Sequence, residues 1–145
     1  MSEASMRSAI EFRLQQYLQA RTPPVALFFE NVKATKPEKK EYVEFTILEG
    51  NSRRANLGDP AKGVVRTVRH VGVLQLDVMY PKDTGMGAVT RLASSCGQLF
   101  DEWSHRLPDN ATVNFKTPKQ TSMGIVGEFQ RIAVSIPYWR DEKSK

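Results

Sequence analysis

The stretch from residue 68 to residue 106 constrains the fold most, because the spacing of its apolar side chains changes once along it. Over residues 68–80 the even positions are mostly apolar: Val68, Gly72, Leu74, Leu76, Val78 and Tyr80. A period of two residues is typical of a β-strand that packs one face against a core. Pro81 then ends the predicted strand, because proline has no N–H to donate to a neighbouring strand.

From Ala88 onward the apolar side chains recur every three or four residues, at Val89, Leu92, Ala93, Cys96, Leu99, Phe100 and Trp103. This spacing predicts a helix of about five turns with one continuous apolar stripe. Residues 82–85 join it to the strand as a tight turn. A strand and a helix joined so closely must pack on each other to bury both apolar faces. We expect this pair to form the centre of the fold.

A first helix is predicted over residues 5–21, because Met6, Ile10, Leu14, Tyr17 and Leu18 share one face at helical spacing. Phe12 falls outside this stripe. An exposed phenylalanine is ordinary on its own, but it could also mark a face that contacts a partner.

Further strands are predicted over residues 25–29, 41–48, 112–116 and 128–138. Residues 117–124 are predicted to form a polar loop, and residues 141–145 a flexible C-terminal tail. The whole chain, residues 1–145, is expected to form a single domain of the α+β class. That domain would contain a mostly antiparallel sheet of about four to five strands, with two helices packed on one face.

Residues 49–67 show neither the two-residue period of a strand nor the three-to-four-residue period of a helix. They contain Arg53, Arg54, Lys62 and Arg66 among glycines and a proline. A connection this long without regular structure is uncommon in a compact domain. Two interpretations stay open: the tip of a long hairpin arm formed by the flanking strands, or a solvated loop. Arg69 adds a fifth basic residue at the start of the next strand.

Few residues suit catalysis or metal binding. The chain has one cysteine and two histidines, without the paired spacing of a zinc site. Cys96 lies on the apolar stripe of the second helix, where a thiol acts as a small hydrophobic group. The Gly85-Met86-Gly87 sequence lacks the third glycine of a dinucleotide-binding turn. We therefore expect no catalytic residues, no cofactor and no metal.

The surface chemistry favours a binding role. The net charge of +5 and the pI of about 9.5 suit an anionic partner without requiring one. Trp139 and Arg140 end the last predicted strand and are candidate interface residues, because aromatic residues and arginine are enriched at interfaces. The longest apolar run, residues 25–29, is too short to span a bilayer, so no membrane contact is expected.

An ordered series of short sequences resembles the tail terminator proteins of long-tailed bacteriophages. The series is Pro-Val-Ala at 24–26, Phe-Glu-Asn-Val at 29–32, Gly-Val-Leu-Gln-Leu-Asp-Val-Met-Tyr-Pro at 72–81, Thr-Gly-Met-Gly at 84–87, the helix at 93–100 and Ile-Pro-Tyr at 136–138. The resemblance spans residues 8–138, which is nearly the whole chain. Residues 49–69 match nothing in it.

The resemblance implies a structural protein of the virion and not an enzyme. Such a protein has a small α/β fold, assembles into a hexameric ring and caps the head-proximal end of the tail tube. The ring stops tube polymerisation and offers a surface for joining the head. The implied partners are copies of itself, the tail tube protein and the head connector or head-completion protein, with assembly in the host cytoplasm.

Our hypothesis for the basic residues is that Arg53, Arg54, Lys62, Arg66 and Arg69 meet an acidic neighbour or line the path of the genomic DNA. Two alternatives stay open. Another phage neck component, such as a head-completion protein, would bind the connector in place of tube ends. A nucleic-acid-binding module would lose affinity for DNA steeply as salt is added.

Overall fold

The computed structural model describes residues 2–21, 24–29, 40–56, 66–83, 85–107 and 111–144. Side chains are described for these residues except at 2–3, 51–56, 66 and 143–144. The elements in chain order are α1 (Ser2–Gln19), β1 (Ala26–Phe29), β2 (Tyr42–Asn56), β3 (Arg66–Pro81), α2 (Met86–Gln98), β4 (Ser104–Arg106), β5 (Thr112–Phe115), β6 (Lys119–Val126) and β7 (Phe129–Ser144).

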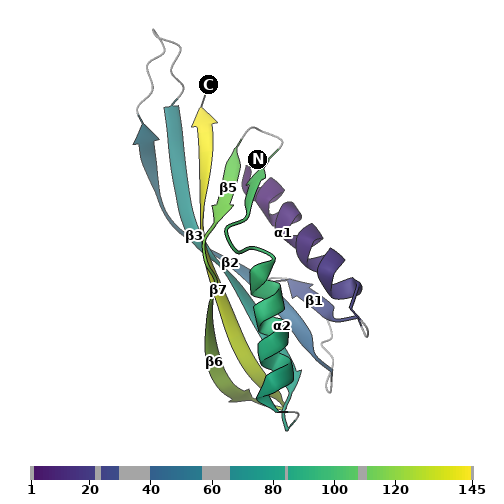
Figure 1. Cartoon of the computed structure of the whole chain (residues 1–145). Helices are drawn as coiled ribbons and strands as arrows, with labels where there is room; N and C mark the ends of the chain where they lie inside the picture. Colours follow the sequence, from purple (N-terminus) through teal and green to yellow (C-terminus); the bar gives the residue numbers. More distant parts are fainter. Residues whose placement is uncertain are drawn as a thin grey trace.

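The strands form one curled sheet in the order β1-β2-β3-β7-β5-β4, and β6 pairs with the first half of β7 (Figure 1). β1 is parallel to β2, and the other pairs are antiparallel. The prediction of about four to five mostly antiparallel strands is therefore wrong. Over the residues that the structure describes, the fold is mostly β, a mixed half-barrel of seven strands with two helices.

The unpredicted strand β6 lies where the sequence suggested a polar loop. All eight of its residues are exposed, so no buried face imposes an alternation on the sequence. Its backbone pairs with β7 from Lys119 opposite Ser135 to Val126 opposite Phe129. β6 forms because its backbone hydrogen-bonds to the free edge of β7. Pairing of this kind leaves no periodic pattern of apolar residues, so the sequence could not reveal the strand.

The second helix is shorter than predicted. α2 ends at Gln98, and Glu102 has a φ of 54°, in the left-handed region that a right-handed helix cannot contain. The apolar spacing continues to Trp103 because that side chain still packs against the core from the turn. Residues 104–106, expected as helix, form the short strand β4 instead.

The core lies between the sheet and both helices, which contribute to one cluster of buried side chains. α1 supplies Met6, Ile10, Leu14 and Leu18, each fully buried, as its stripe predicts. The other buried members include Val43, Phe45, Leu74, Leu76, Val78, Val89, Leu92, Ala93, Phe100, Val134 and Ile136. The sheet curls around the two helices, as Figure 1 shows.

Cys96 lies inside this core. Burial raises the pKa of its thiol from 9.0 to about 12. The thiolate is the reactive form, so we expect thiol reagents at pH 8 to label the native chain on the order of 1,000-fold more slowly than the urea-unfolded chain. The raised pKa favours folding below pH 9, and this contribution is lost as the pH rises toward 12. Equal labelling rates for folded and unfolded chain would show that the core opens at this position.

Three strands extend beyond both helices at the upper end of Figure 1. β2 continues to Asn56, β3 begins at Arg66 and β7 continues to Ser144. We call residues 49–56, 66–72 and 138–144 the arm. Residues 141–144, expected as a flexible tail, pair there with residues 66–69. Residues 57–65 lie outside the described part of the chain.

Candidate functional site

The arm presents different side chains on its two faces, because successive residues of a strand point to opposite sides of the sheet. On β7 the even positions 132, 134, 136 and 138 are buried in the core, and Arg140 continues that series. Trp139 therefore lies on the outer face. Trp139 and Arg140, which were predicted as one interface candidate, therefore point to opposite faces of the sheet.

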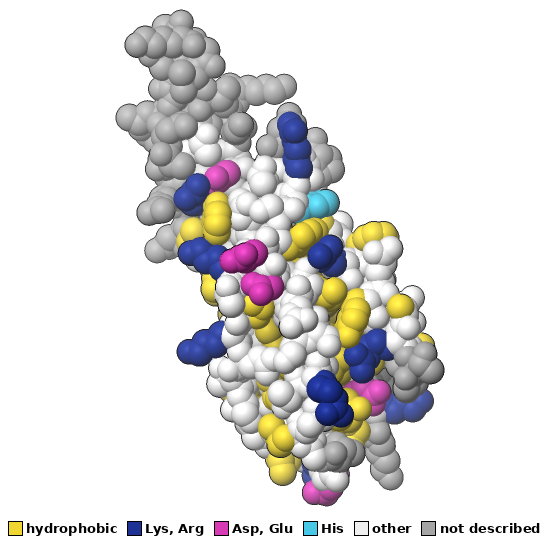
Figure 2. Space-filling model, viewed as in Figure 1, with side chains coloured by type: hydrophobic (Ala, Val, Ile, Leu, Met, Phe, Trp, Pro, Cys, Tyr) yellow, Lys and Arg dark blue, Asp and Glu magenta, His cyan; other side chains and the backbone are white. Residues whose placement is uncertain are grey.

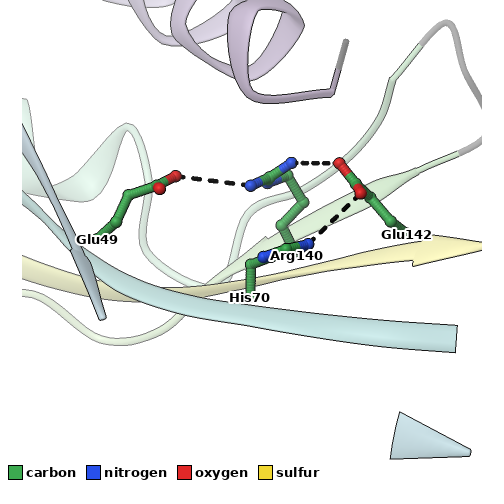
Figure 3. A network of polar contacts seen from close by, with 4 residues as sticks. All are labelled: Glu49, His70, Arg140 and Glu142. Carbon is green, nitrogen blue, oxygen red and sulfur yellow. Dashed lines mark hydrogen bonds and ion pairs between the residues drawn. The ribbon is translucent and has the colours of Figure 1, made fainter. Parts of the chain in front are cut away.

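On the inner face, Arg140 is the centre of an ion-pair network (Figure 3). Its side chain is only 4% exposed, and its Nη1 lies 2.6 Å from Oε1 of Glu142 on the same strand. Its Nη2 lies 3.5 Å from Oε1 of Glu49 on β2. His70 on β3 approaches the other oxygen of Glu142, with Nε2 3.4 Å away. The network ties together the three strands of the arm.

On the outer face, Arg69 donates two hydrogen bonds to Asp141, at 2.8 and 3.0 Å. These bonds raise the pKa of Arg69 above its ordinary value. The guanidinium also lies 5.6 Å from the centre of the Trp139 ring, and Nζ of Lys116 lies 5.5 Å from it. Two parallel hydrogen bonds between a guanidinium and a carboxylate fix the relative orientation of the two side chains and add to their electrostatic attraction. The Arg69–Asp141 ion pair therefore joins β3 to β7.

Three of the other predicted basic residues, all arginines, lie in the strands toward the far end of the arm. In the register of the sheet, Arg53 lies opposite Arg69 and Arg54 lies opposite Val68. Arg66 lies opposite Ser144. The side chains of these three arginines, and the whole of Lys62, are outside the described part. The structure thus brings Arg69, Trp139 and Arg140 into the arm. It also supplies Arg69 and Arg140 with carboxylate partners from the same chain.

A second candidate lies between α1 and β4, where a groove of about 650 Å³ opens to solvent. Its lining includes Phe12, Arg13, Trp103, His105 and Leu107, together with small residues of α1. Phe12 is 65% exposed. The groove was not predicted as a site, although the position of Phe12 off the apolar stripe was the sequence signal for it.

Neither candidate has the donor set of a metal centre. Within the described ranges, no cluster of three or more histidine, cysteine or acidic side chains could hold a metal ion. No helix in this part of the chain is long and apolar enough to cross a membrane. The charged side chains described in the arm pair with carboxylates of the same chain, mostly between neighbouring strands, so these ion pairs stabilise the arm.

Comparison with known families identifies the class of protein. A family model described as phage tail terminator protein matches residues 5–138. The chain belongs to the phage tail terminator family. Membership indicates a protein of the virion tail that associates with other virion proteins, and it agrees with the resemblance seen in the sequence.

A solved structure supports the fold of this terminator independently. Its protein carries no descriptive name, and it matches 100% of this chain and 99% of its own with a TM-score of 0.69 at 20% sequence identity. At this identity the likeness shows the fold alone. No curated protein matches the chain.

The network around Arg140 gives a testable prediction on the terminator's stability. The Arg140→Met change removes the cation and leaves Glu49 and Glu142 facing each other without it. Breaking a buried ion pair costs about 3–5 kcal/mol, but both carboxylates are 40% exposed and can be hydrated. We therefore expect a loss of about 2 kcal/mol in the free energy of unfolding, measured by urea titration. Lys82→Met, which breaks an exposed pair with Glu128, serves as control and should change stability by less than about 1 kcal/mol. Equal losses for the two variants would contradict a structural role for Arg140.

Proposed function

We propose that this terminator assembles as a hexameric ring on the head-proximal end of the tail tube. There it stops further polymerisation of the tube protein and offers a surface to the head connector or head-completion protein. The observation that carries the proposal is the family match across residues 5–138. The role is structural, with no reaction to catalyse.

The shape of the chain suits ring formation. A closed ring needs a heterologous contact, in which one surface of a subunit meets a different surface of its neighbour. The arm and the exposed edge strand β6 are separate surfaces of this kind, at different places on the sheet. Six copies carry six times +5, or +30, in formal charge, which favours an acidic partner or a path for DNA.

The basic residues of the arm divide into two groups under this proposal. Arg69 and Arg140 are already paired with Asp141, Glu49 and Glu142, so we assign them to holding the arm strands together. Contact with an acidic neighbour or with the passing genome then falls to Arg53, Arg54, Lys62 and Arg66. Trp139 remains a candidate contact on the outer face.

A nucleic-acid-binding module is the second candidate, since the chain is basic. Figure 2 shows Lys and Arg side chains spread along the viewed face, with apolar side chains between them. Nucleic-acid-binding surfaces gather basic side chains on one patch or stripe, which the coloured side chains of this one face do not form. DNA affinity that falls steeply with salt would favour this candidate. Binding to the connector in preference to tube ends would favour another neck component.

Polymerisation of purified tail tube protein tests the proposal. The terminator, added in amounts far below one copy per tube subunit, is expected to stop elongation, because only tube ends bind it. Light scattering and electron microscopy would show many short tubes in place of few long ones. Unchanged tube length at saturating terminator would contradict the proposed function.

A further inference from the structure

The groove between α1 and β4 combines an apolar surface with an unneutralised positive charge. Phe12, Trp103 and Leu107 supply apolar lining, and Arg13 also lines the groove. The Nε of Arg13 donates to the carbonyl oxygen of Leu99 at 2.6 Å, and its guanidinium stacks 4.3 Å from the centre of the Trp103 ring. Among the described residues no carboxylate pairs with Arg13. The groove therefore fits a ligand that brings an apolar side chain and a carboxylate together.

The hairpin that joins β6 to β7 offers that combination. Ile125 and Val126 are 61% and 45% exposed, and Glu128 follows them at the turn. Gly127, with φ of 62°, forms the tight turn that holds these side chains at the tip. Lys82 donates its backbone N–H to the carbonyl oxygen of Glu128 at 2.9 Å, which fixes the tip against the end of β3.

The carboxylate of Glu128 is available to a new partner. Its present partner is Nζ of Lys82 at 3.4 Å, and the two side chains are 71% and 38% exposed. An exposed ion pair of this kind contributes little to stability. Glu128 can therefore leave Lys82 and pair with a partly buried arginine at little cost in the free energy of unfolding. Arg13 sits in an apolar setting, where the same charge pair interacts more strongly.

We propose that the β6–β7 hairpin of one copy binds the α1–β4 groove of the next copy, with Ile125 and Val126 against Phe12 and Glu128 paired with Arg13. The inference rests on the proposed ring, for which it names the contact between copies. In Figure 1 β6 and α1 lie on opposite sides of the molecule, so one chain cannot pair its own two surfaces. The contact is heterologous, as a closed ring requires.

Charge reversal at each surface tests the contact in the full-length chain. Arg13→Glu and Glu128→Arg each place like charges together and should weaken self-association about 100-fold or more. Sedimentation velocity over a concentration series measures this. Phe12→Ser, at a largely exposed position, should also weaken association while the thermal midpoint stays near that of the wild type. Asp101→Arg and Arg91→Glu, two exposed charges outside both surfaces, should associate as the wild type does.

Mixing the two reversed variants gives the sharpest outcome. The groove of the Arg13→Glu chain then faces the hairpin of the Glu128→Arg chain, and the reverse pairing is equally favourable. Assembly is expected to return in the equimolar mixture, with the two chains in a 1:1 ratio by mass spectrometry. The double variant in one chain should also assemble.

The failures of this inference and of the proposed function are distinguishable. If the wild type assembles and both single variants assemble equally well, the hairpin–groove contact is overturned and the ring stands. A wild type that stays monomeric in solution also overturns the contact. The ring's role is judged separately, by whether the terminator limits tube length.

Discussion

Replacing Gly72 by alanine is expected to lower the free energy of unfolding by about 3 kcal/mol or more. A Cβ at this position would lie 2.6 Å from the carbonyl oxygen of Leu48 and 2.6 Å from the Oη of Tyr138, with the ring carbon Cζ at 2.7 Å. The first obstacle is backbone of the neighbouring strand, and the second is the ring of a buried residue. Neither can move without shifting β2 or β7 against β3.

The position makes the effect large, because Gly72 stands where the core ends and the arm begins. Urea unfolding followed by circular dichroism measures the loss. Gly87→Ala is the matched control: the nearest atom to its new Cβ is the end of the flexible Arg91 side chain, at 3.2 Å. In helix α2 that change should stabilise by about 0.5–1 kcal/mol. A Gly72→Ala chain as stable as the wild type would show that the three central strands are not packed as described.

Reversing Arg53 and Arg54 to glutamate is expected to block ring or tail assembly while the monomer stays folded. Both residues lie in β2 on the arm, and position 53 is paired with Arg69. A glutamate opposite an arginine is a favourable cross-strand pair, so the sheet should tolerate the change. The two new glutamates would repel an acidic partner, which costs several kcal/mol in the free energy of binding and is enough to prevent assembly.

The measurement is complementation of a phage that lacks the gene, with tails counted by electron microscopy. Lys40→Glu with Arg91→Glu is the control, because it changes the net charge by the same amount at exposed positions outside the arm. Normal tails from the Arg53 and Arg54 double variant would remove these arginines from the assembly contacts. Loss of tails from both double variants would assign the effect to net charge alone.

The strongly periodic parts of the sequence predicted the structure well. The stripe of Met6, Ile10, Leu14 and Leu18 is buried in α1, and Val89, Leu92 and Cys96 are buried in α2. β3 alternates as expected, with Leu74, Leu76 and Val78 all inside the core. In each case burial of one face imposes a period that the sequence must keep.

The remaining elements are held by backbone pairing, which leaves no such period. β6 is exposed on every residue, and the arm carries charged residues on both faces. The parallel pairing of β1 with β2 joins residues 26–29 to residues 42–45, and no local pattern specifies a parallel neighbour. These missing pieces account for the wrong strand number and sheet type.

The sequence located the candidate residues but not their contacts. Trp139 and Arg140 were predicted as interface residues and Arg69 as one of the basic contacts; all three lie in the arm, and their role in binding stays a prediction. Two of their carboxylate partners are distant in sequence: Glu49 is 91 positions from Arg140, and Asp141 is 72 positions from Arg69, whereas Glu142 is only two positions from Arg140. The sequence could not reveal these ion pairs. The groove was missed because Arg13 and Trp103 are far apart in the sequence and come into contact only in the folded chain.

Electron cryomicroscopy of tube ends tests the central claim most directly. Tubes formed from purified tube protein in the presence of the terminator should carry a six-fold ring of this chain at one end and nowhere along the wall. Tubes whose two ends are bare, or that carry the chain along their length, would contradict the claim that it works by closing the tube.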